Sequence, residues 1–192
     1  MAPESAKSAR LKLLLIGLFF ALPLLLAWAA YWFHWTPGRS GNYGELLPPR
    51  QVPGGGLVGL DGKPFSLASL RGKWVMLQFD AGTCDSYCER KLYFMRQLRV
   101  AQGKDMDRVE RVWVLTDGGV PRPALKAAIE GTHVVRASSG SLPASFPRGR
   151  RAADHIYLID PLGNLMMRFP RDPDPSKMLK DLQRLLKYSQ IG

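Results

Sequence analysis

Apolar residues form one unbroken run near the N-terminus and a series of shorter, periodic segments after residue 56. The run at residues 13–33 reads LLLIGLFFALPLLLAWAAYWF and contains no charged side chain. A helix of roughly 20 residues is long enough to cross the hydrocarbon of a bilayer, where backbone polar groups must pair with one another. The pattern therefore predicts a single transmembrane helix over residues 13–33.

The residues that flank this run indicate its orientation. Three basic side chains precede it, Lys7, Arg10 and Lys12. Only Arg39 follows closely, and basic residues favour the cytoplasmic side of a membrane. We therefore expect residues 1–12 to form a cytoplasmic tail of a single-pass inner-membrane protein whose remainder faces the periplasm. The alternative is a cleaved signal peptide, because Ala27-Trp28-Ala29 resembles a cleavage site, although the apolar run continues past it.

Residues 34–56 are rich in proline and glycine and show neither a helical nor a strand period, which predicts a linker. Residues 57–192 then alternate between short apolar runs and amphipathic segments. A hairpin is expected around Asp61-Gly62, since Asp-Gly between two short apolar runs is a strong turn signal. The expected strands are 74–79, 109–115, 134–135, 156–159 and 165–169. The expected helices are 86–101, 122–130 and 176–188, with Ser176 capping the last. This order implies an α/β fold, a mixed sheet with helices on its faces.

Composition narrows the possible functions. Lys plus Arg number 27 against 16 for Asp plus Glu, a formal net charge of +11. The basic residues are scattered among acidic ones, the densest group being Arg148, Arg150 and Arg151, and no nucleic-acid-binding motif is present. We therefore expect no nucleic-acid partner, and a basic surface that steers the domain toward an acidic protein. Two cysteines are too few for a disulfide scaffold or a zinc array.

The two cysteines, Cys84 and Cys88, follow the predicted central strand at residues 74–79 and open the helix predicted at 86–101. Residues four apart on a helix share a face, and amides at a helix N-terminus lower the pKa of a thiol. In an exposed pocket two such sulfurs have three uses. They bind Cu(I), which prefers soft ligands. They exchange with a partner's disulfide. Or they form a static disulfide, which stabilises little because so short a loop removes little chain entropy.

A third ligand would favour copper over redox chemistry alone. The histidines are His34, His133 and His155, and each is most simply a structural or interface residue. A neutral imidazole beside two thiolates would suit Cu(I). Met95 could supply a thioether, but a methionine at that position is more simply part of the core.

Several of these segments resemble the Sco/SenC family. They are Gly62-Lys63-Pro64-Phe65-Ser66-Leu67, Gly72-Lys73-Trp74, Cys84-x-x-x-Cys88, and Asp154-His155 followed by Tyr157-Leu158-Ile159-Asp160-Pro161. Members of that family are membrane-anchored, thioredoxin-like copper chaperones and thiol reductases of cytochrome c oxidase assembly. The resemblance implies a thioredoxin-like mixed sheet and a Cu(I) site formed by Cys84, Cys88 and His155. It also implies an oxidase subunit or another assembly factor as partner.

The sequence departs from the family pattern at three points, one of which is the stretch Gly118–Pro123 after Asp117. Asp85 stands where the family has a proline after the first cysteine. Only Ile156 separates His155 from Tyr157, so Ala152 takes the usual place of the family's histidine and His155 is displaced along the chain. These changes leave the cysteine pair intact.

The main hypothesis is therefore a divergent, membrane-anchored assembly factor for cytochrome c oxidase. It would either deliver Cu(I), as a metallochaperone without turnover, or reduce a client disulfide through Cys84 and Cys88, as a thiol–disulfide oxidoreductase. The alternative is an interaction module that binds no metal and keeps a structural disulfide.

Overall fold

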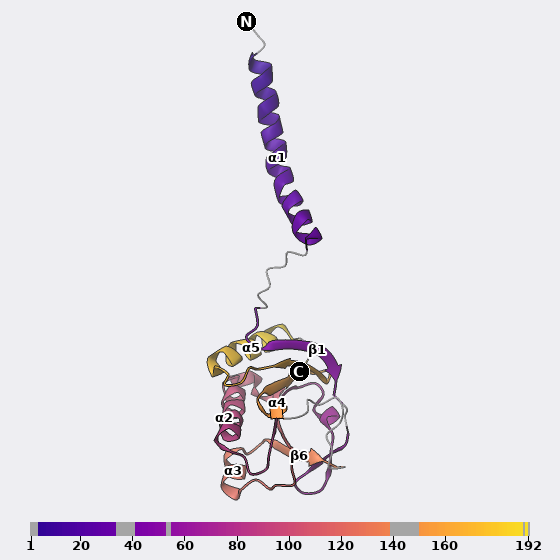
Figure 1. Cartoon of the computed structure of the whole chain (residues 1–192), viewed down its shortest axis with the longest axis vertical. Helices are drawn as coiled ribbons and strands as arrows, with labels where there is room; N and C mark the ends of the chain where they lie inside the picture. The colour runs from indigo at the N-terminus through magenta and orange to yellow at the C-terminus, as the bar shows by residue number, and fades with distance from the viewer. Residues whose placement is uncertain (1–3, 34–40, 53–54, 139–149, 190, 192) are drawn as a thin grey trace. The chain divides into compact units, whose positions relative to one another are not determined.

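The computed structural model describes residues 4–33, 41–52, 55–138, 150–189 and 191. The chain divides into two units, Met1–Ser40 and Gly41–Gly192 (Figure 1). His34, Arg39 and Arg148 lie outside the described residues, as do the parts of the predicted linker at 34–40 and 53–54.

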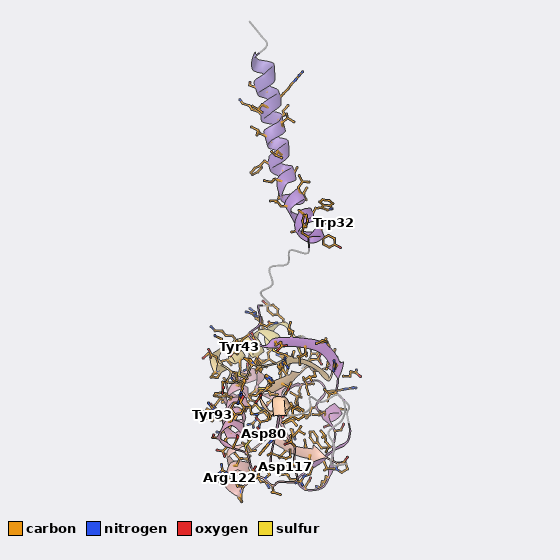
Figure 2. All side chains as sticks on the ribbon, viewed as in Figure 1. Trp32, Tyr43, Asp80, Tyr93, Asp117 and Arg122 are labelled. Atoms are coloured by element: carbon orange, nitrogen blue, oxygen red, sulfur yellow. A yellow bond between two sulfur atoms is a disulfide. The ribbon has the colours of Figure 1, made fainter. Side chains whose placement is uncertain are left out.

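The first unit contains one long helix, α1 (Glu4–Trp32), which continues through Pro23. Its segment Ser8–Trp32 is long and apolar enough to cross a membrane. The side chains of the segment Ser8–Trp32 project outward from the helix, and Trp32 stacks on Trp28 at its end (Figure 2). The helix predicted at 13–33 is thus present and begins earlier, so the segment predicted as a tail is itself largely helical. A helix of this kind fits a single-pass membrane anchor.

The second unit is built on one mixed sheet with the strand order β1-β8-β7-β4-β5-β6-β2-β3. The three strands β4, β5 and β6 are parallel, and the other neighbours are antiparallel. The bounds are β1 (Glu45–Gln51), β2 (Leu57–Gly59), β3 (Pro64–Phe65), β4 (Trp74–Asp80), β5 (Val109–Leu115), β6 (His133–Ala137), β7 (Ile156–Ile159) and β8 (Asn164–Arg168). The hairpin expected around Asp61-Gly62 and the five expected strands are confirmed.

Helices cover both faces of this sheet. One face packs against α2 (Ser86–Val100) and α5 (Pro175–Tyr188), and the cluster between them includes Met76, Met95 and Leu182. The opposite face packs against the short helices η1 (Leu67–Leu70) and α4 (Arg150–Ala153). Two further helices are η2 (Gly103–Arg108) and α3 (Pro123–Ala128). Because side chains alternate along a strand, β4 sends residues 74, 76, 78 and 80 toward the α2 face.

The segment predicted as a linker contributes a strand to the sheet. β1 pairs with β8 at the sheet edge, and Glu45 accepts two hydrogen bonds from Arg168 at 2.7 and 3.0 Å. Prolines are tolerated there because an edge strand needs only half of its backbone groups for the ladder. The pairing shifts register between Leu46 and Arg50, where Pro48 and Pro49 lie. An exposed edge strand has no alternating pattern of apolar residues, so the sequence did not predict β1. The folded unit therefore begins at Gly41 rather than at the expected residue 57.

The last helix also begins differently from the prediction. Asp174, not Ser176, is the N-cap of α5, and its carboxylate accepts hydrogen bonds from the amides of Ser176 and Lys177. Pro175 takes the first helical position, where a missing N–H costs nothing. The loop expected at 138–154 contains α4 in its described part, and residues 139–149 lie outside the described residues.

A buried carboxylate attaches the start of the folded unit to α5. Asp181 accepts hydrogen bonds from the amides of Tyr43 and Gly44, both at 2.8 Å. We expect Asp181→Ala to lower the free energy of unfolding by about 2–3 kcal/mol, because two backbone donors lose a charged acceptor in the interior. Thermal unfolding followed by near-ultraviolet circular dichroism would measure this. The exposed Asp107→Ala is the control, and an equal loss in both variants would contradict the assignment.

Candidate redox site

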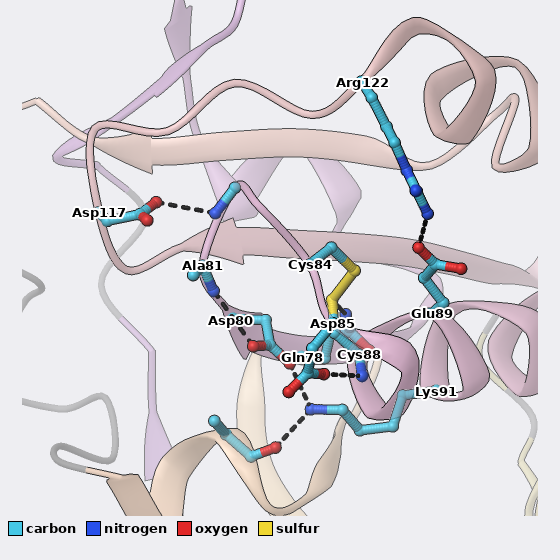
Figure 3. The surroundings of a disulfide bond; sticks show 12 residues. Gln78, Asp80, Ala81, Cys84, Asp85, Cys88, Glu89, Lys91, Asp117 and Arg122 are labelled. Carbon is cyan, nitrogen blue, oxygen red and sulfur yellow. Dashed lines mark hydrogen bonds and ion pairs between the residues drawn. A yellow bond between two sulfur atoms is a disulfide. The ribbon is translucent and has the colours of Figure 1, made fainter.

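The two cysteines lie at the corner where the central strand β4 turns into α2, and they form a disulfide (Figure 3). Their Cα atoms are 5.2 Å apart. β4 ends at Asp80 and α2 begins at Ser86, so the loop that carries Cys84 follows a strand in the middle of the sheet. The carboxyl end of such a strand is where open α/β sheets bind ligands.

The backbone places the sulfurs together in a way that the sequence did not suggest. Cys84 precedes the helix and adopts a left-handed conformation with φ of +42°. Asp85 is the N-cap, and its carboxylate accepts a hydrogen bond from the amide of Cys88 at 2.8 Å. The expectation that both cysteines share one helical face is therefore wrong, because Cys84 lies in the loop before the helix and only Cys88 lies in its first turn.

A neighbouring loop holds this turn from the other side. The amides of Gly82 and Gly119 both donate to the Asp117 carboxylate, at 2.8 and 3.1 Å. A Cβ at Gly82 would lie 2.4 Å from the backbone of Gly119, so the two loops approach more closely than any other residue at 82 would permit. The loop that carries Cys84 is thus fastened to the end of β5.

The disulfide is buried, which corrects the expectation of an exposed pocket. Cys84 is 4% exposed and Cys88 is fully buried. They belong to an apolar cluster whose other buried members come from α2, β5 and the α3 segment, namely Leu92, Trp113, Leu115, Leu125 and Ile129. A molecule that reacts with either sulfur must first displace part of this cluster.

The segment at α3 is the outer part of this cover. Leu125 and Ile129 contribute its apolar contacts, and Arg122 at the start of α3 forms an ion pair with Glu89 of α2 (Figure 3). A groove of about 580 Å³ runs along β2, β3 and β6, and its walls include Leu60 and Val134, which pack against the disulfide cluster. No cysteine lines this groove, so it approaches the disulfide without opening onto it.

Polar side chains lie beneath the disulfide, and the sequence analysis missed their role. Lys91, whose side chain is 1% exposed, pairs with Asp80 at 2.8 Å. The Lys91 ammonium also donates to the carbonyl of Ala153 and lies 4.9 Å from the centre of the Tyr87 ring. Burial raises the pKa of the Tyr87 hydroxyl, which donates to the Asp154 carbonyl at 2.8 Å.

Gln78 completes this polar layer, and its side-chain Nε2 lies 3.6 Å from the sulfur of Cys88. A sequence signal for the layer did exist. Gln78 and Asp80 interrupt the apolar character of β4 at positions that face α2. Their location in a central strand marks them as interior polar groups rather than surface ones.

The histidines do not join the cysteines. Nδ1 of His155 lies 2.7 Å from the carbonyl oxygen of Phe169 and donates to it, at the start of β7. His133 lies 3.5 Å from Glu110. Met95 is buried in the separate cluster against α5. Among the described residues, no three His, Cys, Asp or Glu side chains are placed to hold a metal ion. The donor set of Cys84, Cys88 and His155 therefore does not fit a copper site in this arrangement.

Comparison with known proteins identifies the fold. A family model described as "Transmembrane-like, thioredoxin-like, C-terminal domain" matches residues 74–189. No curated protein sequence matches the chain.

Solved structures of Sco proteins are similar to the chain. Yeast Sco1 with copper bound matches with a TM-score of 0.60 and 16% identity, covering 74% of this chain and 96% of that one. Apo Sco1 from Thermus thermophilus matches with 0.58 and 21%, covering 75% and 96%. ScoI from Bradyrhizobium japonicum with copper bound matches with 0.51 and 21%, covering 73% and 99%. These likenesses show the fold, so the thioredoxin-like mixed sheet expected from the Sco/SenC resemblance is confirmed.

If the α3 segment shields the disulfide, weakening its contacts should expose Cys84. We expect Leu125→Ala to accelerate reduction of the disulfide by a bulky phosphine severalfold, because a lost apolar contact favours local opening. Lys126→Ala, an exposed change on the same helix, is the control and should leave the rate unchanged. Equal rates for Leu125→Ala and the unaltered protein would show that opening occurs elsewhere.

Proposed function

We propose that this chain, which belongs to the transmembrane-like, thioredoxin-like C-terminal domain family, reduces a disulfide of a client protein with Cys84 and Cys88. The observation that carries the proposal is the Cys84–Cys88 disulfide at the end of the central strand, with interior polar groups beneath it. A static disulfide needs no such groups, and closing so short a loop adds little stability.

The geometry favours Cys84 as the cysteine that contacts the client. Cys84 lies in the turn before the helix and is the less buried of the two, whereas Cys88 lies inside the first turn of α2 above Gln78. The positive end of the α2 dipole favours thiolate at both positions. The Asp85 carboxylate opposes this, but it is engaged with the amide of Cys88.

The reaction consists of two exchanges. In the reduced chain, the Cys84 thiolate attacks one sulfur of the client disulfide, forms a mixed disulfide and releases the other client sulfur as a thiolate. Cys88 then loses its proton to solvent, attacks the Cys84 sulfur and releases the second client thiolate. The client gains two electrons, and the Cys84–Cys88 disulfide seen in this structure is the product. A second dithiol must reduce it for another turnover.

The client and location follow from the sequence resemblance and from α1. An N-terminal apolar helix supports a membrane anchor, with the folded unit on the periplasmic side of the inner membrane, where disulfides persist. The client would be a cytochrome c oxidase subunit or another assembly factor of that enzyme. The formal net charge of +11 supports an acidic docking surface on the client.

Delivery of Cu(I) by Cys84, Cys88 and His155, which the resemblance implies, has less support from the described residues. Yeast Sco1 and Bradyrhizobium japonicum ScoI were solved with copper bound. In this chain His155 is held by the Phe169 carbonyl and belongs to no group of potential metal ligands among the described residues. Thiol exchange requires only the two sulfurs, which are in place.

Trapping the mixed disulfide tests the exchange reaction. Cys88→Ser should accumulate a covalent complex with a disulfide-containing substrate, because nothing remains to release the client from Cys84. Cys84→Ser should form at least tenfold less of the complex, and the reduced unaltered chain should form it only transiently. Non-reducing electrophoresis and mass spectrometry of the full chain in detergent would measure these species. If neither variant forms a complex, the structural-disulfide alternative holds.

Copper binding is tested separately, by competition for Cu(I) against a thiol-free chelator whose Cu(I) complex is coloured. The loss of that colour measures the Cu(I) affinity of the reduced chain. We expect His155→Ala to leave the Cu(I) affinity of the reduced chain within about twofold of its original value, because the imidazole is not beside the sulfurs. Cys84→Ser is the positive control and should weaken whatever binding the two thiolates provide. A tenfold or greater loss in His155→Ala would restore the three-ligand chaperone hypothesis.

A further inference from the structure

Gln78 has an unusual position for an uncharged polar side chain. It is fully buried in the central strand β4, and its Nε2 donates to the Cys88 sulfur at 3.6 Å, a normal distance for sulfur (Figure 3). Its Oε1 has no hydrogen-bond partner among the described residues. A buried amide oxygen without a hydrogen-bond partner is destabilising. Stability alone therefore gives no reason for a glutamine at this position.

The surroundings of Cys88 explain what such a group can do. Its neighbours in the cluster include Leu92, Trp113 and Leu115, and burial among apolar groups disfavours a thiolate. The nearby charges of Lys91 and Asp80 lie 2.8 Å apart and largely cancel. In the described part of the chain, the Cys88 sulfur accepts one hydrogen bond, which comes from the Gln78 amide.

Reduction of the disulfide would change the strength of the hydrogen bond between Gln78 and Cys88. A thiolate at Cys88 is a much stronger acceptor for Nε2–H than a disulfide sulfur is. The hydrogen bond from Nε2, which is present in the disulfide form, is therefore strongest when Cys88 is a thiolate, the form that the second exchange step needs.

We propose that Gln78 is a positioning residue that holds Cys88 and promotes its ionisation for the second exchange step. This inference rests on the proposed function but concerns a residue that the cysteine motif does not contain. Because the amide is neutral, it stabilises the buried thiolate without the repulsion that a carboxylate would add. The first step, attack by Cys84, does not depend on it.

Trp113 is a candidate second member of this arrangement. It is the register partner of Gln78 across β4 and β5, it belongs to the cysteine cluster, and its Nε1 also has no hydrogen-bond partner among the described residues. Unpaired polar atoms on two residues in register indicate that the polar side chains here are not fully hydrogen-bonded in the disulfide form.

The test measures ionisation of Cys88 directly, in the full chain with Cys84→Ser in detergent, from thiolate ultraviolet absorbance against pH. We expect half-ionisation at or below the value for an ordinary cysteine, about 8.5, in spite of full burial. Gln78→Met, which keeps the length but removes both hydrogen-bonding atoms, should leave about tenfold less thiolate at neutral pH. Half-ionisation well above the ordinary value in the Cys84→Ser chain would overturn the inference without any variant of Gln78.

The kinetic readout uses the reduced chain with both cysteines. In Gln78→Met the mixed disulfide should persist about threefold to fourfold longer, since a less acidic thiol is also a stronger nucleophile and offsets part of the lost thiolate. The rate of formation of the mixed disulfide should not change. Gln78→Glu should prolong the intermediate further at high pH, because its carboxylate repels the thiolate.

Gln102→Met is the matched control for packing. Gln102 is also buried, but it lies beyond the C-terminal end of α2, and its Nε2 donates to the Leu98 carbonyl at 2.7 Å rather than to a cysteine. We expect it to lower thermal stability without changing the titration or the lifetime. An equal effect of Gln102→Met and Gln78→Met would overturn the inference. If the unaltered chain forms no mixed disulfide, the proposed function is overturned instead. The pH titration of Cys88 would still test whether Gln78 promotes its ionisation.

Discussion

The hydrogen bond from the Cys88 amide to the Asp85 carboxylate is the interaction on which the site depends. It caps α2 at the residue directly after Cys84, so that Cys88 lies in the first helical turn while Cys84 remains in the preceding loop. The left-handed backbone at Cys84 then turns its sulfur back toward Cys88. Asp85, which replaces a proline of the Sco/SenC pattern, is therefore a capping residue and not only a negative charge beside the thiols.

Burial of Cys84 and Cys88 limits how readily their disulfide can react. The apolar cluster around the disulfide stabilises the corner between β4, α2 and α3, but it also covers the sulfurs. The polar layer of Gln78, Asp80 and Lys91 lies on the inner side, where Gln78 and Lys91 are buried and Asp80 is partly exposed. Such a site reacts when the outer cover opens locally, and local opening of a short surface helix costs less than global unfolding.

The three residues expected to bind copper occur in the sequence, but the fold does not bring them together as a metal site. His155 follows the short helix α4 and enters β7, which is antiparallel to β4 and adjacent to it in the sheet. Its ring nevertheless donates to Phe169 at the end of β8 and packs against Tyr157. A shift of three positions along the chain, relative to the family pattern at Ala152, is enough to place the imidazole in a different environment. Ala152 itself is buried in the core on the other face of the sheet.

The sequence alone determined the apolar helix, the order of strands and helices, and the position of Cys84 and Cys88 after the central strand, because periodic burial and turn residues are local signals. It did not reveal β1, whose edge position requires no alternation, or the Asp174 cap, which Pro175 separates from the first amide it binds. Only the tertiary structure decided that the disulfide is covered by α3, that His155 lies apart from it and that Gln78 contacts Cys88. These are contacts between elements distant in sequence, and they depend on how the sheet and helices pack rather than on any local pattern.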